Sequence, residues 1–264
     1  MIEPLIVVEE HHSFAAHFGA AKPVTAASPK ALHAAMNKFA HGALWVARPA
    51  LMMKWLGTTE AITKTNHRLL LIGNAKAPER AFFRAFFENV VVPDDDMQSL
   101  GLDNLFDVLG SPNRSNLFIA GAVAPAAKAL VLIRGNLDSL VVPFSLFTHR
   151  PSGPKPDFSD FEVTDSGQTI RLGEYEAASD ALLYELDPEF RRTEKKRRIS
   201  EDKSLGGALR RLRLQRGLGR ESFPGITAKT IARIERGEVK EPHADTLSTI
   251  AAKLGVKPDE IATY

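Results

Sequence analysis

Thr227-Ala-Lys-Thr-Ile-Ala-Arg-Ile-Glu-Arg-Gly237 is the stretch of this chain that decides the fold of its C-terminal part. Thr227 is a good helix N-cap, because its hydroxyl accepts a hydrogen bond from a free backbone N–H of the first turn. Gly237 suits the left-handed position that closes a helix. The stretch therefore predicts one short helix, whose Ile231 and Ile234 are three residues apart and face a core.

The other face of this helix is small near its start and cationic further along. We expect it to expose Ala228, Lys229, Ala232, Arg233 and Arg236. Such a helix can enter a DNA major groove about 12 Å wide, where Lys or Arg reaches guanine O6 and N7 and an alanine methyl reaches a thymine methyl. The pattern favours double-stranded DNA as the partner.

Helical patterns flank this helix on both sides. Apolar residues recur at helical spacing at Leu205, Leu209, Leu212, Leu247, Ile250 and Leu254. A last turn starts at residues 257–261, with proline near its N-terminus. These segments, together with a short second helix at 220–223, predict an all-α, five-helix unit at residues 204–264.

Three sequence blocks carry a family resemblance. They are Leu-Arg-Arg-Leu-Arg-Leu-Gln-Arg-Gly-Leu at 209–218, Thr-Ile-Ala-Arg-Ile-Glu-Arg-Gly at 230–237, and Leu-Gly-Val-Lys-Pro-Asp-Glu-Ile at 254–261. With these blocks, residues 204–262 resemble the Cro/C1-type (XRE) helix-turn-helix family. The resemblance implies a lambda-repressor-like fold and a transcriptional regulator that binds double-stranded DNA.

The resemblance also implies roles for individual residues. Positions that meet base edges hold Ala228, Lys229 and Arg233. Positions of phosphate contacts, which set register but carry no sequence information, hold Arg220, Arg236 and Lys240. Arg213 and Glu235 look like the paired charges that tie the first helix to the recognition helix.

One segment departs from the family pattern. Leu218 to Thr227 is shorter than the family leads us to expect, and Pro224-Gly225 occupies the turn. The second helix, Arg220 to Phe223, is therefore expected to be about one turn long. This departure changes the segment that carries Arg220 and leaves the helix that carries Lys229 and Arg233 unchanged.

The positive charge of the chain is concentrated near this motif. Residues 190–264 hold 18 Lys and Arg and 10 Asp and Glu, a net charge of +8, whereas residues 1–189 hold 16 and 22, a net charge of −6. Such a distribution is typical of a surface that binds nucleic acid. The alternative, a helical bundle used for protein contacts, stays open.

A basic linker is expected at residues 191–203, and its run Arg191-Arg-Thr-Glu-Lys-Lys-Arg-Arg198 is either linker or a helix that extends into the DNA-binding unit. A run of charges is usually a solvated face, and that is one hypothesis. The other is that its six cations lie along the backbone of the same DNA and add salt-sensitive affinity.

The first 190 residues predict an α+β region of mixed helices and antiparallel strands. We expect an α/β region of unknown role at 1–114 and a small α+β domain at 115–190. Strands are predicted at 4–8 and 68–74, in a meander over 117–143, and in a hairpin around Ser166-Gly167. Helices are predicted at 29–39, 49–56, 78–89, 97–109 and 174–187.

The segment at 115–190 also carries a resemblance, through Val141-Val-Pro-Phe-Ser, Pro156-Asp-Phe and Gly167-Gln-Thr-Ile-Arg-Leu-Gly-Glu-Tyr-Glu-Ala. It resembles a small uncharacterised prokaryotic domain that can precede a Cro-like helix-turn-helix. That domain has no established chemistry, so the resemblance supports the pairing of domains and no active site.

Composition excludes some sites and disfavours others. The chain has no cysteine, which excludes disulfides and thiolate metal sites. The early histidines fit no compact ligand pattern, and Asp94-Asp-Asp96 is better explained as a cap before a helix than as a cation site. We expect no metal and no cofactor. No membrane span or signal peptide is predicted, so we expect a soluble cytoplasmic protein.

The leading hypothesis is a sequence-specific DNA-binding transcriptional regulator that acts as a homodimer, since one recognition helix makes few base contacts. A narrower version is an autoregulating antitoxin whose N-terminal region holds another protein. A sensor that binds a small ligand there is a further alternative. An enzyme targeted by the helix-turn-helix is the least supported, because residues 1–190 hold no motif of catalytic residues.

Overall fold

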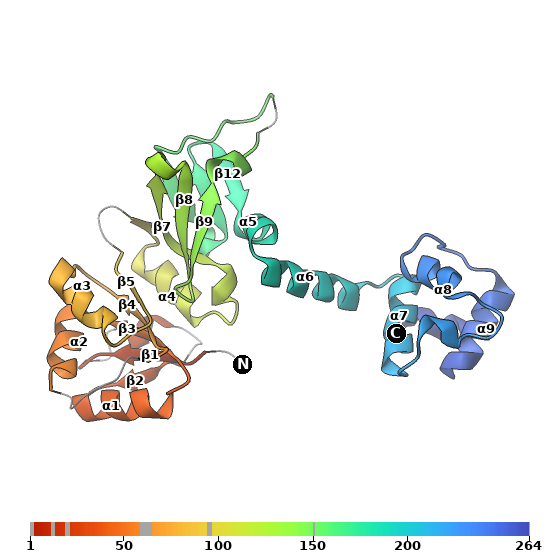
Figure 1. Cartoon of the computed structure of the whole chain (residues 1–264), viewed down its shortest axis with the longest axis horizontal. Helices are drawn as coiled ribbons and strands as arrows, with labels where there is room; N and C mark the ends of the chain where they lie inside the picture. Colours follow the sequence, from red (N-terminus) through yellow and green to blue (C-terminus); the bar gives the residue numbers. More distant parts are fainter. Residues whose placement is uncertain are drawn as a thin grey trace. The chain divides into compact units, whose positions relative to one another are not determined.

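Short apolar segments in the first third of the chain form a five-stranded parallel sheet (Figure 1). Its strands are β1 (Leu5–Val8), β2 (Val24–Ala26), β3 (Leu44–Ala47), β4 (Arg68–Leu71) and β5 (Asn89–Val91). They lie in the order β2-β1-β3-β4-β5, an order of doubly wound α/β sheets. The computed structural model describes residues 3–11, 14–18, 22–58, 65–93, 97–149 and 151–263.

The expectation of antiparallel strands was wrong for this sheet. All of its neighbouring strands pair in parallel. Parallel strands are usually buried on both faces, so they lack the alternation of polar and apolar residues that marks a half-exposed strand. The segments of β2, β3 and β5 are short and lack that alternation, and none of them was predicted as a strand.

Three helices cover one face of this sheet. They are α1 (Pro29–Lys38), α2 (Pro49–Leu56) and α3 (Ala77–Arg84), and they form one apolar core with the strands. Trp45 and Leu69 point into this core, whereas their neighbours Val46 and Leu70 point to the opposite face. All four are fully buried, which explains the continuous apolar runs in the sequence.

The other two sheets of the first unit are antiparallel, as predicted for the meander over 117–143 and for the hairpin around Ser166-Gly167. A four-stranded sheet contains β6 (Gln98–Ser99), β7 (Phe118–Ala124), β8 (Ala129–Arg134) and β9 (Ser139–Pro143). A three-stranded sheet contains β10 (Phe161–Thr164), β11 (Thr169–Leu172) and β12 (Tyr175–Ala178). The predicted hairpin turn lies at Gly167, whose φ is +82° and whose added Cβ would lie 2.3 Å from Phe118 O.

Two predicted helices begin later than expected, because a short strand precedes each. The helix expected at 97–109 is α4 (Leu102–Gly110), after β6. The helix expected at 174–187 is α5 (Ser179–Leu186), after β12. The cap predicted at Asp94–Asp96 lies outside the described residues.

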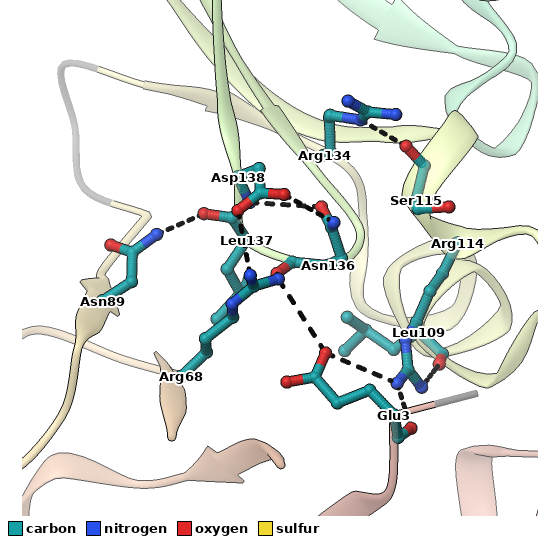
Figure 2. A network of polar contacts seen from close by, with 10 residues as sticks. All are labelled: Glu3, Arg68, Asn89, Leu109, Arg114, Ser115, Arg134, Asn136, Leu137 and Asp138. Atoms are coloured by element: carbon teal, nitrogen blue, oxygen red, sulfur yellow. Dashed lines mark hydrogen bonds and ion pairs between the residues drawn. The ribbon is translucent and has the colours of Figure 1, made fainter. Parts of the chain in front are cut away.

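A polar network joins the parallel sheet to the antiparallel part of the first unit (Figure 2). Arg68 at the start of β4 donates to Asn136 O at 2.9 Å, and Asn89 at the start of β5 donates to Leu137 O. Arg114, which is 6% exposed, donates to Leu109 O at 3.2 Å and to Glu3 O. Burial raises the pKa of the Glu3 carboxyl, against the opposing effect of Arg68 and Arg114.

The contacts divide the chain into two units, Met1–Asp187 and Pro188–Tyr264. The second unit contains α6 (Pro188–Glu201), α7 (Leu205–Gln215), α8 (Ala228–Glu235) and α9 (Ala244–Leu254), with 3-10 turns η6 (Arg220–Ser222) and η7 (Pro258–Thr263). Two of the five predicted helices of 204–264 are thus 3-10 turns. The segment expected as a linker or helix extension is mostly helical, since α6 covers it up to Glu201. The predicted domain boundaries stay predictions.

We expect Arg114→Gln to destabilise the first unit by about 2–4 kcal/mol, because glutamine is too short to reach the carbonyls of both Leu109 and Glu3 from its buried position. Urea unfolding followed by tryptophan fluorescence measures this unit alone, since the chain's two tryptophans, Trp45 and Trp55, both lie in it. The exposed Arg84→Gln is the matched control and should change stability by less than about 0.5 kcal/mol. Equal effects of the two variants would contradict a structural role for the network.

Candidate nucleic-acid interface

Helix α8 has the ends that the sequence predicts. The Thr227 hydroxyl accepts a hydrogen bond from the backbone N–H of Thr230 at 3.1 Å, and Gly237 has a φ of +71°. Ile231 is 0% exposed and Ile234 is 1% exposed, and both pack in the core of the second unit. The apolar face of α8 is therefore fixed, and the orientation of its other face follows from it.

The outer face of α8 carries exposed cations. Lys229, Arg233 and Arg236 are all exposed and lie at positions i, i+4 and i+7, which form one stripe along a helix. Ala228 at the start of the helix and Lys240 beyond its end are also exposed. The prediction for Ala232 was wrong: it is 8% exposed, because it shares a helix face with the buried Glu235, three residues further on.

A buried ion cluster holds α8 against the rest of the second unit. Arg213 Nε of α7 donates to Glu235 Oε1 at 2.6 Å, and its Nη2 donates to Oε2 at 3.3 Å. Arg220 Nε of η6 donates to Glu235 Oε2 at 2.8 Å. The Glu235 side chain is 1% exposed and that of Arg213 is 8% exposed, so the carboxylate is paired away from water.

These contacts determine the ionisation of Glu235. Burial by itself would raise its pKa, but the hydrogen bonds from Arg213 and Arg220 outweigh burial and hold the pKa below its ordinary value. Glu235 is therefore ionised at neutral pH. Arg213 Nη1 also donates to Leu218 O at 2.7 Å, which connects the end of α7 to the segment before η6.

Arg220 contacts a carboxylate that its predicted role did not include. Its Nε faces Glu235, and its side chain is 39% exposed. The contact with Glu235 fixes where the Arg220 guanidinium lies, so a phosphate could bind its remaining N–H groups only at that place. A phosphate contact of Arg220 stays a prediction.

Glu238 is a residue of this face that sequence reasoning missed. Arg236 Nε donates to Glu238 Oε1 at 2.6 Å, and Arg233 Nε lies 3.4 Å from Glu238 Oε2. The hydrogen bond from Arg236 lowers the pKa of Glu238, so the carboxylate is charged at neutral pH. The sequence held one indication of these contacts, because a carboxylate directly after Gly237 can reach cations in the last turn of α8.

The connection between α7 and α8 is short, as expected from the segment in which the sequence departs from the family pattern. η6 is a 3-10 turn of three residues, and Gly225 has a φ of +73° in the turn before α8. Phe223 is 2% exposed and packs in the same core as Ile231 and Ile234. The core is therefore closed although the second helix is short.

No group of three or more His, Asp or Glu side chains in the described part of the chain is arranged to hold a metal ion. No described helix is both long and apolar enough to cross a membrane.

We expect Glu235→Gln to destabilise the second unit by about 3 kcal/mol, because it leaves the buried Arg213 without its counter-charge. Amide hydrogen exchange of α7, α8 and α9 in the full-length chain measures this change. The deficit should shrink as the pH falls below about 4, since the wild-type carboxylate contributes stability above its unfolded-state pKa and loses it on protonation.

The matched control is Glu241→Gln, which removes the same charge from an exposed side chain of the same unit. It should leave exchange in α7, α8 and α9 unchanged. Unchanged exchange in Glu235→Gln as well would show that the ion cluster does not hold α8.

Comparisons with known proteins agree with this geometry in the second unit. Residues 204–263 match the family model of a helix-turn-helix domain. No curated protein and no solved structure matches the chain. The segment 204–263 is therefore a helix-turn-helix domain, which indicates that this part of the chain binds DNA.

Proposed function

We propose that the protein is a sequence-specific transcriptional regulator that binds double-stranded DNA, with α8 in the major groove. The observation that carries the proposal is the exposed stripe of Lys229, Arg233 and Arg236 on a helix whose other face is buried in a helix-turn-helix domain. Lys229 and Arg233 would contact guanine O6 and N7, and Ala228 would contact a thymine methyl. In this proposal the described residues have no catalytic task.

The residues around α8 have a different task in this proposal. Arg236 and Lys240 are exposed at and beyond the end of α8, where they would bind phosphates on the groove edge. Phosphate contacts fix the register of the helix but are independent of sequence. The concentration of positive charge in residues 190–264, a net +8, supports the attraction of this part of the chain to DNA.

We further propose that the regulator acts as a homodimer. One helix of eight residues offers few side chains to the bases, and helix-turn-helix proteins commonly place two recognition helices on half-sites about 34–36 Å apart. The mass of the protein on a selected duplex tests this point. One chain per palindromic site would contradict it.

Selection from random duplex DNA with the full-length protein tests the proposed function. We expect one enriched, two-fold symmetric sequence. The double variant Lys229→Ala and Arg233→Ala should lose this enrichment, because each bidentate base contact contributes about 1–3 kcal/mol of discrimination. Weak binding to any sequence should remain in that variant, since Arg236 and Lys240 are unchanged.

The matched control is the double variant Lys253→Ala and Lys257→Ala, which removes two exposed cations from the same domain outside α8. It should enrich the wild-type sequence. If the wild-type protein enriches no sequence, or if both double variants lose enrichment equally, base recognition by α8 is contradicted.

Glu238 should weaken DNA binding, because it competes with phosphates and bases for Arg233 and Arg236. We expect Glu238→Gln to bind the selected duplex more tightly, by about fivefold at most, since exposed ion pairs are weak. Fluorescence anisotropy at fixed salt measures the affinity. The control is Glu241→Gln, an exposed carboxylate close by, and weaker binding by Glu238→Gln would instead mean that Glu238 orients the arginines for DNA.

A further inference from the structure

Helix α6 does not have the composition of a helix that packs in an apolar core. Its 14 residues include none that is buried, and nine of them are charged. A helix that is polar all round needs other support, such as ion pairs between successive turns. Arg197 supplies these pairs, since its Nη1 donates to Glu201 at 2.9 Å and its Nε donates to Glu194 at 3.0 Å.

The end of α6 is attached to the helix-turn-helix domain by specific contacts. Arg211 of α7 donates to Ser200 O at 3.3 Å and to Asp202 O. Asp202 in turn accepts from Ser204 N at 2.9 Å, and the Ser204 hydroxyl caps α7. Gly207 permits this close approach, because a Cβ there would lie 2.4 Å from Asp202 O. We therefore treat α6 and the helix-turn-helix domain as one continuous surface.

Five of the six cations of α6 fall into two sets, and the sixth, Arg191, is half-buried. Arg197 and Arg198 pair with the carboxylates of Glu194 and Glu201 on the same helix. Arg192, Lys195 and Lys196 are exposed and form no ion pair with any carboxylate in the described part of the chain. The second set occupies positions i, i+3 and i+4, which lie on one side of a helix. We call these three residues the α6 stripe.

We infer that the α6 stripe binds the phosphate backbone of the DNA whose bases α8 contacts, beside the major-groove site. The inference rests on the proposed function and extends it to a second DNA-binding element. The three residues span about 6 Å of helix axis. Over that length duplex DNA carries about three to four phosphate charges, so the charge density of the stripe matches that of its partner.

The chemistry of the stripe suits phosphates rather than bases. Its side chains are long, flexible and cationic, and the stripe holds no small residue that would let the helix backbone approach base edges. Its contribution should therefore be independent of sequence and strongly dependent on salt. The paired set, Arg197 and Arg198, should contribute little, because its charge is already neutralised within the helix.

The test is the salt dependence of binding by the full-length triple variant Arg192→Gln, Lys195→Gln and Lys196→Gln. Glutamine retains high helix propensity, so α6 should persist. The slope of log affinity against log salt concentration is measured on the selected duplex between about 50 and 200 mM salt. Its magnitude should fall by about 2–3, because each phosphate that the protein neutralises contributes about 0.9 to the slope. The triple variant should select the same sequence as the wild-type protein.

Two controls separate a local contact from a loss of overall charge. The variant Lys22→Gln, Lys30→Gln and Lys155→Gln removes three exposed cations from the first unit, and Arg197→Gln removes a paired cation from α6. Both should keep the wild-type slope. Hydroxyl-radical footprinting should show protected backbone positions beside the site that disappear only in the α6 triple variant.

The outcomes distinguish failure of this inference from failure of the proposed function. A wild-type protein that selects no duplex contradicts the proposed function and removes the basis of the inference. If the wild-type protein selects a sequence but the triple variant keeps its slope and footprint, only the role of the α6 stripe is overturned. A slope that falls equally in the first-unit control would overturn it as well, because the effect would then be one of net charge.

Discussion

The buried cluster of Arg213, Glu235 and Arg220 is the constraint on which the arrangement of the second unit depends. An eight-residue helix is too short to be stable alone, so α8 keeps its shape and direction only through its contacts. Ile231 and Ile234 fix which face is buried, and Glu235 ties the C-terminal end of α8 to α7 and η6. A buried carboxylate tolerates few alternative positions, because leaving it unpaired costs several kcal/mol. The cationic face of α8 is thereby held outward.

Charges on this unit serve three distinct purposes in our account. Arg213 is neutralised in the core and sets geometry, whereas Lys229 is exposed and without a carboxylate partner among the described residues, as a base contact requires. Arg233 and Arg236 are intermediate, since Glu238 holds both and must release them to DNA. The α6 stripe would add affinity without specificity. Affinity and specificity would thus be supplied by different elements and could be altered separately.

The sequence was most informative about features that depend on residues close together along the chain. Caps, apolar spacing and three family blocks predict α8 and its exposed cations, and the family resemblance pairs Arg213 with Glu235, whose side chains are in contact. It was less informative where tertiary contacts decide the outcome. Examples are the burial of Ala232, the contact of Arg220 with Glu235, and the contacts of Glu238 with the two arginines of α8. Each depends on how the chain packs around α8. The parallel sheet was missed because strands buried on both faces show no alternation, and β2 and β5 contain only three residues each.

The most direct test of the central claim, that α8 contacts bases in the major groove, is methylation interference on the selected duplex. Methylation of guanine N7 blocks the major-groove edge that Lys229 and Arg233 would contact, whereas methylation of adenine N3 alters the minor groove. We expect N7 methylation of at least one guanine in each half-site to abolish binding, and N3 methylation of adenines in the same half-sites to be tolerated. Tolerance of N7 methylation throughout the site, with interference from N3 methylation instead, would contradict the account.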